Sequence, residues 1–262
     1  MRLEGSLFNL FNNVLRSQAM PSQNEWASAA GRRAIGSVEV TKTQWDGFAG
    51  ATAKGRLVGF DPVDADRDLA DLYQAGIEGE APERIWDYLG YGPFSSAEDM
   101  RPWLSSVAQA KDAVYVGYRD NATGRLGGMG SFMEIRQNFG VAEIGNIWFG
   151  HAWQRGPRTT EVLSLMMHHV MDTLGYRRLE WKCNAFNNPS RSAALRLGFR
   201  FEGEFLNHLI VKGRSRDTAW FSITDEEWPG VRQAHATWLA PSNFDADGNQ
   251  KQSLSDLTMA LW

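Results

Sequence analysis

Apolar and polar residues alternate, or apolar residues run together in short stretches, at several places between residues 56 and 224. Both patterns are typical of β-strands, and turn-forming residues bound most of the stretches. The segment 120–125, Asp-Asn-Ala-Thr-Gly-Arg, is one such turn. The expected strands cover residues 56–60, 113–119, 126–134, 142–149, 178–184, 199–205, 207–214 and 217–224.

Other segments have the spacing of helices. Residues 61–73 begin with a turn and carry acidic residues in the first helical turns, and residues 97–110 form a second helix. Between residues 163 and 174 apolar side chains recur every three or four positions, and Gly175 follows as a stop signal. A short helix is predicted to begin at Asn188-Pro189 and to end at Gly198.

The order of these elements predicts the fold class. Three consecutive strands between residues 113 and 149 form an antiparallel meander, whereas the strand–helix–strand unit at 143–184 requires one parallel pair. The expected fold is therefore α+β (mixed α/β), with a twisted mixed sheet that is mostly antiparallel and is flanked by helices. We expect an N-terminal extension at 1–54, one folded domain at 55–228 and a C-terminal tail at 229–262.

The charge of the chain is unevenly distributed along the sequence. Residues 56–149 carry 8 basic and 15 acidic residues, a net −7, whereas residues 150–220 carry 11 basic and 6 acidic residues, a net +5. An ordinary solvated surface accounts for this pattern. The alternative is a basic half that binds an anionic cofactor and an acidic half that receives a cationic substrate.

Several functional classes are not expected. The arginines are scattered and no nucleic-acid-binding signature occurs, so we expect no nucleic-acid partner. The sequence has no run of eighteen apolar residues, so we expect no membrane span. The single cysteine, Cys183, excludes an internal disulfide, and a reducing cytoplasm is the expected location. His168 and His169 lack Cys or Asp partners, so we expect no metal. A monomer or homodimer is expected.

A basic loop between the strand ending near Phe149 and the following helix is the most informative segment. It reads Gln154-Arg-Gly-Pro-Arg-Thr-Thr-Glu161. Successive backbone N–H groups at a helix N-terminus favour phosphate binding, although a plain strand–helix connection is the alternative. The pattern of a P-loop nucleotide site is absent.

This loop resembles the pyrophosphate loop of GNAT N-acetyltransferases, Gln/Arg-x-x-Gly-x-Gly/Ala. Gln154 matches, whereas Pro157 replaces the first Gly and Thr159 the second small residue. Thr160-Glu161, and the later Asn187-x-x-Ser190, Gly198-Phe199 and Glu202-Gly203, resemble the branch that acetylates ribosomal-protein N-termini (the Rim type). The closing Glu227-Trp228 resembles that branch too. The resemblance covers about residues 56–228.

The resemblance implies a GNAT-like sheet with a splayed parallel pair, and acetyl-CoA as co-substrate. Exposed main chain at the splay would hold the pantetheine arm and the thioester, the loop amides would bind pyrophosphate, and Asn187 would meet the cofactor. Pro157 leaves fewer amides for this. The implied cofactor-binding residues are Ile147, Trp148, Phe149, Gln154, Arg155, Gly156, Arg158, Thr159, Thr160 and Asn187.

Acetyl transfer to an alkyl amine needs a base, because the amine is mostly protonated at neutral pH. Glu143 is the first candidate, and Glu134 on the neighbouring strand is the second; a solvated carboxylate on a strand is the alternative for Glu143. Ser190 is expected to bond the leaving sulfur, or only to cap a helix, since the position of the family's usual Tyr holds Ala194. Cys183 shares strand parity with core residues and is expected to be buried.

The expected function is transfer of an acetyl group from acetyl-CoA to a primary amine, a protein N-terminus or a small molecule, by direct attack in a ternary complex. The alternative is a non-catalytic CoA-binding regulatory protein. An aromatic segment precedes the meander in the acidic half and is expected to line the acceptor pocket. The expected substrate-binding residues are Trp86, Tyr88, Tyr91 and Glu134.

Overall fold

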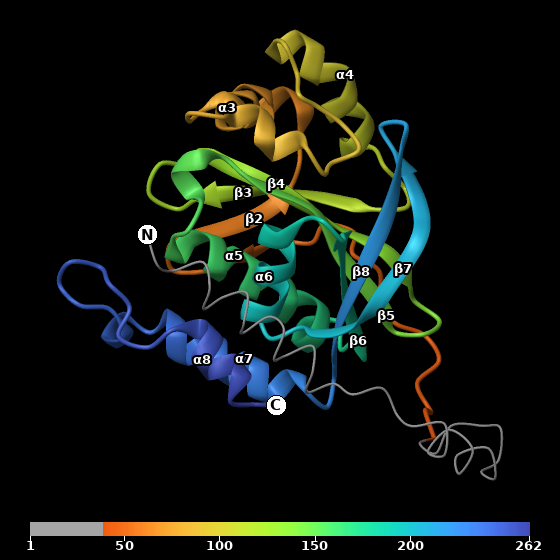
Figure 1. Cartoon of the computed structure of the whole chain (residues 1–262), viewed down its shortest axis with the longest axis vertical. Helices are drawn as coiled ribbons and strands as arrows, with labels where there is room; N and C mark the ends of the chain where they lie inside the picture. Colours follow the sequence, from red (N-terminus) through yellow and green to blue (C-terminus); the bar gives the residue numbers. More distant parts are fainter. Residues whose placement is uncertain (1–38) are drawn as a thin grey trace. The chain divides into compact units, whose positions relative to one another are not determined.

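The computed structural model describes residues 39–262, of which residues 43–262 form one compact unit. An eight-stranded sheet runs through this unit in the order β1-β2-β3-β4-β5-β6-β8-β7 (Figure 1). Every neighbouring pair is antiparallel except β5 and β6, which are parallel. This arrangement confirms the predicted mixed sheet with a single parallel pair. The strands are β1 (Ala53–Lys54), β2 (Val58–Pro62), β3 (Val114–Asp120), β4 (Leu126–Arg136), β5 (Val141–Phe149), β6 (Arg178–Asn184), β7 (Arg200–Val211) and β8 (Arg214–Thr224).

Helices cover both faces of the sheet, and each face has its own hydrophobic cluster. One face packs against α3, η1 and α4, and the other packs against α5 and α6, with α7 and α8 beyond them. Among residues 39–262 we find no helix that is both long and apolar enough to cross a membrane. The helices are α3 (Ala65–Ile77), η1 (Pro82–Trp86), α4 (Ala97–Ala108), η2 (His151–Trp153), α5 (Pro157–His168), η3 (His169–Thr173), α6 (Asn188–Arg196), α7 (Trp228–Leu239), η4 (Pro241–Asn243) and α8 (Leu254–Met259).

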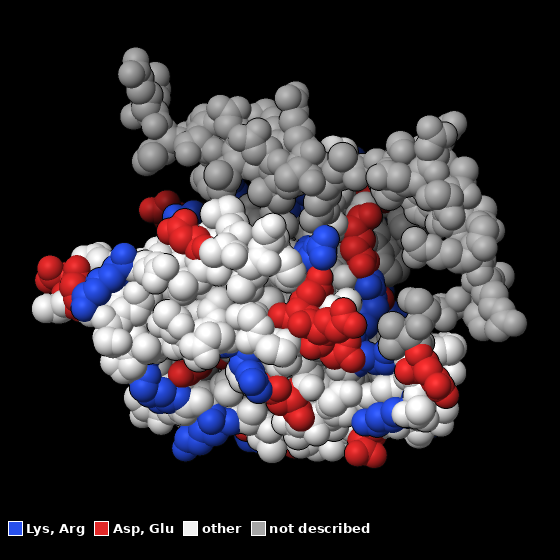
Figure 2. Space-filling model, turned by 90° about the horizontal axis from the view of Figure 1, so that it is seen from below, with Lys and Arg blue, Asp and Glu red and all other residues white. Residues whose placement is uncertain are grey.

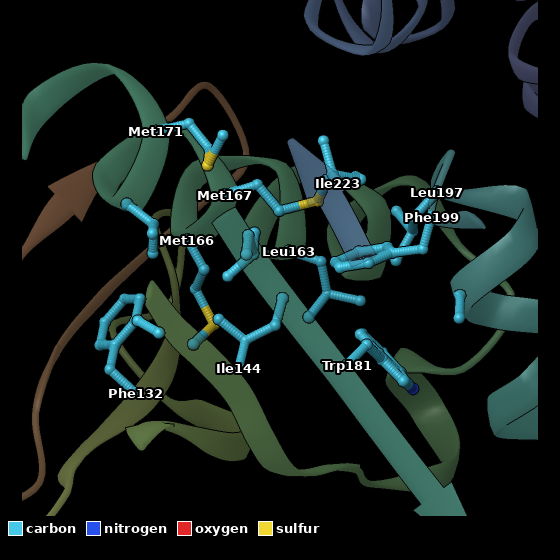
Figure 3. Packing of buried hydrophobic residues seen from close by; sticks show 14 of the residues in the cluster. Phe132, Ile144, Leu163, Met166, Met167, Met171, Trp181, Leu197, Phe199 and Ile223 are labelled. Atoms are coloured by element: carbon cyan, nitrogen blue, oxygen red, sulfur yellow. The ribbon is translucent and has the colours of Figure 1, made fainter. Parts of the chain in front are cut away.

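Helix α5 contributes Val162, Leu163, Met166 and Met167 to the larger hydrophobic cluster. Met166 and Met167 reach from α5 toward Ile144 and Ile223 on the strands (Figure 3). The apolar repeat predicted a helix over 163–174, and the structure extends it toward the N-terminus, to Pro157, and finishes it as the π-helix η3. The repeat marks only apolar positions, so it misses the first helical turn, Pro157-Arg-Thr-Thr, which does not continue the repeat.

The edge of the sheet is one long hairpin rather than the three strands predicted between residues 199 and 224. A single strand, β7, continues through an irregularity between Phe205 and Leu209, and turns into β8 at Lys212-Gly213. Asn207 adopts a positive φ of 51°, and its amide donates to the Asp217 side chain at 2.7 Å. This bulge interrupts the alternation of side chains, which explains the predicted break there.

Segments on both sides of the predicted domain also pack on the core. Trp45 and Phe48 are buried in the larger cluster, so the boundary predicted at residue 54 falls inside packed structure. Most of the predicted extension lies outside the described residues. In the predicted tail, α7 buries Trp228, Val231 and Trp238, and its contacts lie with α5 and α8.

A buried histidine links this C-terminal helix to the core. The Nε2–H of His235 donates to the carbonyl of Leu197 at 2.9 Å, so its Nδ1 accepts from the Ser164 hydroxyl at 3.1 Å. His235 has no exposed surface, and burial lowers its pKa to about 4, from 6.5. The folded protein therefore holds this imidazole neutral at pH values where an unfolded chain would protonate it.

We expect the free energy of unfolding to fall as the pH drops from about 6.5 toward 4. Between these two pH values the unfolded state binds a proton at this histidine that the folded state does not bind. At the lower end of the range, this difference lowers the free energy of unfolding by about 3 kcal/mol. Urea denaturation at pH 7 and pH 4.5 measures the effect, and His235→Gln should lose this part of the pH dependence. His151→Gln, at an exposed position, is the control; identical pH dependence in all three proteins would contradict the assignment.

Candidate active site

The parallel strands β5 and β6 separate part-way along their length. They pair from Val141 with Arg178 as far as Glu143 with Glu180, and no further pairing between them follows. On its other side β5 remains paired with β4 to its end, through an irregularity near Asn146, which has a φ of 53°. The edge of β5 that faces β6 is therefore unpaired beyond Glu143, and the main chain of residues 147–149 lies along this splay.

The N-terminus of α5 follows immediately after β5. Gly156 is the N-cap and Pro157 occupies the first helical position, where a backbone N–H would have no helical partner. Pro157 therefore removes an amide from the loop, as expected, but strengthens the start of the helix. The amides of Arg158 and Thr159 have no hydrogen-bond partner within residues 39–262. A helix terminus of this kind attracts anions.

Side chains in the loop mainly bind the protein itself. Arg158 Nε forms an ion pair with Asp120 at 2.8 Å, and Thr159 Oγ1 donates to the carbonyl of Trp153 at 2.5 Å. Thr160 Oγ1 accepts from Arg196, and Gln154 Nε2 donates to the carbonyl of Phe149. Arg155 is exposed with a φ of 61°. The loop therefore offers main-chain N–H groups, with Arg155 as its available charge, rather than a set of cationic side chains.

The predicted base lies at the last paired position before the splay. Glu143 is buried, and its Oε2 forms an ion pair with Lys182 Nζ at 2.8 Å. Burial raises the pKa of Glu143, and Lys182 acts in the opposite direction. No hydrogen bond to Oε1 is recorded among the described residues. A carboxylate with a raised pKa and one unbound oxygen is suited to accept a proton near neutral pH.

A second carboxylate, Glu180, completes a network with Lys182. It lies 3.0 Å from Lys182 Nζ and also forms ion pairs with Arg136 and Arg178. Burial would raise the pKa of Glu180, but these cations outweigh it and lower the pKa. Glu180 is thereby held ionised by three cations, whereas Lys182 is the one cation at ion-pair distance from Glu143 in the described part of the chain.

The predicted contacts at the start of α6 are only partly available. Asn187 Oδ1 accepts from the Ser190 amide as a helix cap, which leaves the side-chain NH₂ for a cofactor. Ser190 Oγ accepts from Trp181 Nε1 at 3.0 Å and can still donate its own proton. Cys183 is buried as predicted, and burial raises the pKa of its thiol.

The aromatic segment is divided between packing and surface. Trp86 is buried, with its ring centroid 5.1 Å from that of Trp148, so it belongs to the smaller cluster and does not line an open pocket. Tyr91 stacks on Trp103, and its hydroxyl donates to the carbonyl of Asn146 at 3.4 Å. Tyr88 is exposed and donates to the carbonyl of Phe186 at 3.1 Å. Tyr91 and Tyr88 thus reach β5 and the turn after β6, respectively.

Glu134 is exposed, has a φ of 47° and lines a hollow of about 590 Å³. No hydrogen bond or ion pair of its carboxylate is recorded within the described residues. The other lining residues of this hollow come from α4, β3, β4 and the connection after α4: Ser106, Val107, Ala110, Asp112, Ala113, Tyr115, Met133, Ile135 and Arg136. Glu134 also lies close enough to Glu143 to raise its pKa slightly.

Lys182 is the site residue that sequence reasoning missed. It shares strand parity with Glu180 on β6, and the strand order places both beside Glu143. The available signal was the alternation along β6, which places Lys182 on the same polar face of the strand as Arg178 and Glu180. The acidic segment 56–149 and the basic segment 150–220 partly neutralise each other in the fold, because the ion pairs Glu143–Lys182 and Asp120–Arg158 join them. On the face seen in Figure 2, acidic and basic side chains are interspersed.

Comparison with known proteins identifies the family. Residues 58–200 match the model of the acetyltransferase (GNAT) domain. The chain belongs to the GNAT acetyltransferase family. A GCN5-related N-acetyltransferase from Brucella melitensis is 40% identical, with a TM-score of 0.81 over 84% of this chain and 99% of that one. The chain is thus an acetyltransferase, as predicted.

More distant relatives agree with this assignment. The N-acetyltransferase p20 of Bacillus licheniformis is 27% identical over 56% of this chain and 83% of its own length. RimJ from Mycobacterium smegmatis, whose structure is a complex with CoA-disulfide, is 20% identical, with a TM-score of 0.56 over 78% of this chain and 88% of that one. At this identity the RimJ comparison establishes the shared fold alone.

Proposed function

We propose that the protein transfers an acetyl group from acetyl-CoA to a primary amine by direct attack in a ternary complex. The observation that carries this proposal is the position of Glu143 at the last β5–β6 pair, beside the splay. Glu143 lies on β5, the strand that leads to the N-terminus of α5. The amine acceptor is a protein N-terminus or a small molecule.

The described residues fit acetyl-CoA. The amides of Arg158 and Thr159 and the guanidinium of Arg155 provide an anion site for pyrophosphate. The unpaired edge of β5 at residues 147–149 offers main-chain groups to an extended pantetheine arm, as the edge of a sheet does to a peptide. The NH₂ of Asn187 lies at the start of α6, on the other side of the splay.

Acetyl-CoA supplies an activated acetyl thioester, and the protein supplies position and proton transfer. Glu143 Oε1 takes the proton that the attacking amine loses as its nitrogen bonds to the carbonyl carbon. Main-chain N–H groups on the open edge of β5 stabilise the developing oxyanion. The Ser190 hydroxyl donates to the leaving sulfur as the carbon–sulfur bond breaks. Burial raises the pKa of Cys183, so this thiol is a poor acetyl carrier, which favours direct attack.

The acceptor reaches Glu143 from the side of the 590 Å³ hollow. Glu134 and Asp112 line it and favour a cationic ligand such as an alkylammonium group. Tyr88 and Tyr91 have hydroxyl contacts to the chain on either side of the splay. The resemblance of the Asn187–Gly203 segment to the Rim-type branch supports a protein N-terminus, whereas the hollow is equally suited to a small amine.

Acetyl-CoA at one hundred times its dissociation constant should raise the melting temperature by about 5 to 10 °C. Binding at this concentration stabilises the folded state by about 2.7 kcal/mol, and a domain of this size gains a few degrees for each kcal/mol. Differential scanning fluorimetry measures the shift, with AMP at the same concentration as the control. A melting temperature that does not respond to acetyl-CoA at any concentration would refute the cofactor assignment.

Initial-rate kinetics test the reaction itself. Direct attack in a ternary complex gives intersecting lines when acetyl-CoA and amine are varied together, whereas an acetyl-enzyme gives parallel lines. Intersecting lines are expected, with a peptide and a small amine compared as acceptors. CoA binding without consumption of the thioester by any amine would instead favour a non-catalytic CoA-binding regulator.

A further inference from the structure

Lys182 lies between two carboxylates beside the proposed reaction centre. Its Nζ atom is 2.8 Å from Glu143 Oε2 and 3.0 Å from Glu180 Oε2. The three side chains are only 10%, 6% and 4% exposed, respectively. The ammonium group also lies 4.2 Å from the ring centroid of Trp220 on β8, so its direction is fixed by contacts from three strands.

The two carboxylates depend on Lys182 to different degrees. Arg136 and Arg178 also pair with Glu180, so that residue keeps two cations if Lys182 is lost. Glu143 has no other ion pair with residues 39–262. The remaining charged groups that act on Glu143 are Glu180 and Glu134, which disfavour its ionisation, and Arg216, whose charge interacts with it from β8.

Lys182 also determines which oxygen of Glu143 is available. It holds Oε2, and Oε1 lies on the side of Gly145, within 3.3 Å of the position that a Cβ there would occupy. Gly145 is the second residue beyond the last β5–β6 pair, where the strands have begun to separate. Oε1 therefore lies beside a part of β5 that has no partner on β6.

We propose that Lys182 is a positioning residue that keeps Glu143 ionised and directs its Oε1 toward the attacking amine. This inference rests on the proposed function. In the step concerned, the amine nitrogen bonds to the acetyl carbon, the bond to sulfur breaks, and the amine proton passes to Oε1. Lys182 stays protonated throughout and contacts no reacting atom. The neutral Glu143 then returns its proton to solvent.

The test compares pH–rate profiles of the wild type, Lys182→Met and Lys182→Arg with one acceptor amine. Without the ammonium, an unpaired buried carboxylate binds a proton more readily. The acid limb of kcat in Lys182→Met should therefore move up by at least one pH unit, with turnover at pH 7 falling tenfold or more and recovering as the pH rises. Lys182→Arg, which keeps the charge, should stay within about half a unit of the wild type. The KM for acetyl-CoA should change less than threefold, because the phosphates are bound elsewhere.

Glu143→Gln, measured in parallel, separates this inference from the proposed function. If Glu143→Gln loses turnover but the acid limb of Lys182→Met stays at the wild-type position, the role of Lys182 is refuted while the base assignment stands. If Glu143→Gln retains turnover, the base assignment itself fails. Should Lys182→Met not fold, ¹³C NMR of glutamate carboxyl groups in the wild type, assigned with Glu143→Gln, is decisive. An ionised Glu143 at pH 7 is expected, and a protonated one would overturn the proposal.

Discussion

Glu143→Gln should lower turnover by a factor of about one hundred to ten thousand. Gln keeps the size of the side chain and its hydrogen-bonding capacity, but it cannot take the proton from the amine, and general-base assistance is typically worth this much. The affinity for acetyl-CoA should barely change, because Glu143 lies away from the loop amides. A thiol-release assay at saturating acetyl-CoA measures the effect.

The pH dependence of this variant makes the test specific. Burial raises the pKa of Glu143, so the wild-type rate should fall on the acid side at a pH above the usual range of a glutamate. The loss caused by Gln should shrink as pH rises, since more of the amine is then already neutral. Glu134→Gln, on the adjacent strand, is measured in parallel as the variant of the second candidate base. Near-normal turnover of Glu143→Gln across pH would shift the base role to Glu134, or to selection of the neutral amine from solution.

Glu161→Ala should lower the free energy of unfolding by about 3 to 5 kcal/mol. Glu161 is buried in the second turn of α5, and its carboxylate accepts from the amides of Arg56, Leu57 and Val58 at 2.7 to 3.0 Å. Removal of the carboxylate leaves these donors, which enter β2, without a partner, and hydrogen bonds to charged groups are among the stronger ones. Urea denaturation at pH 7 measures the loss.

Glu98→Ala is the control for this effect. Glu98 lies near the start of another helix, α4, but it is exposed, and its removal should cost less than about 0.5 kcal/mol. Equal stability of Glu161→Ala and the wild type would show that the amides of β2 find other partners. Glu161 belongs to the segment that resembles the GNAT cofactor loop, so the structure adds a role in stability to that motif.

Local patterns were sufficient to predict most elements of the domain. The apolar stripe on α5, the Asn-Pro start of α6 and the alternation in β3 to β6 each reflect one element and its own burial. The parallel β5–β6 pair followed from chain order, since a strand–helix–strand unit returns in the same direction. The loop motif at Gln154 then placed the helix N-terminus beside the end of β5.

Features that depend on contacts between distant segments were not predictable in this way. The Glu143–Lys182 pair joins residues 39 positions apart and depends on the strand register, which no local pattern specifies. Trp86 was expected in a pocket because aromatic residues suit both pockets and cores, and only packing against Trp148 distinguishes the two. Helix α7 was missed although its buried residues Trp228, Val231 and Trp238 have helical spacing, and its contacts with α5 were not predicted.

Mass spectrometry of the acetylated product tests the central claim most directly. The protein is incubated with acetyl-CoA and a panel of a small alkyl amine, a diamine and peptides with free N-termini, with Glu143→Gln in parallel. The account predicts a product 42 Da heavier than at least one amine, formed together with free CoA and strongly reduced in the variant. Intact acetyl-CoA and unmodified amines throughout the panel, in a protein that binds CoA, would contradict it.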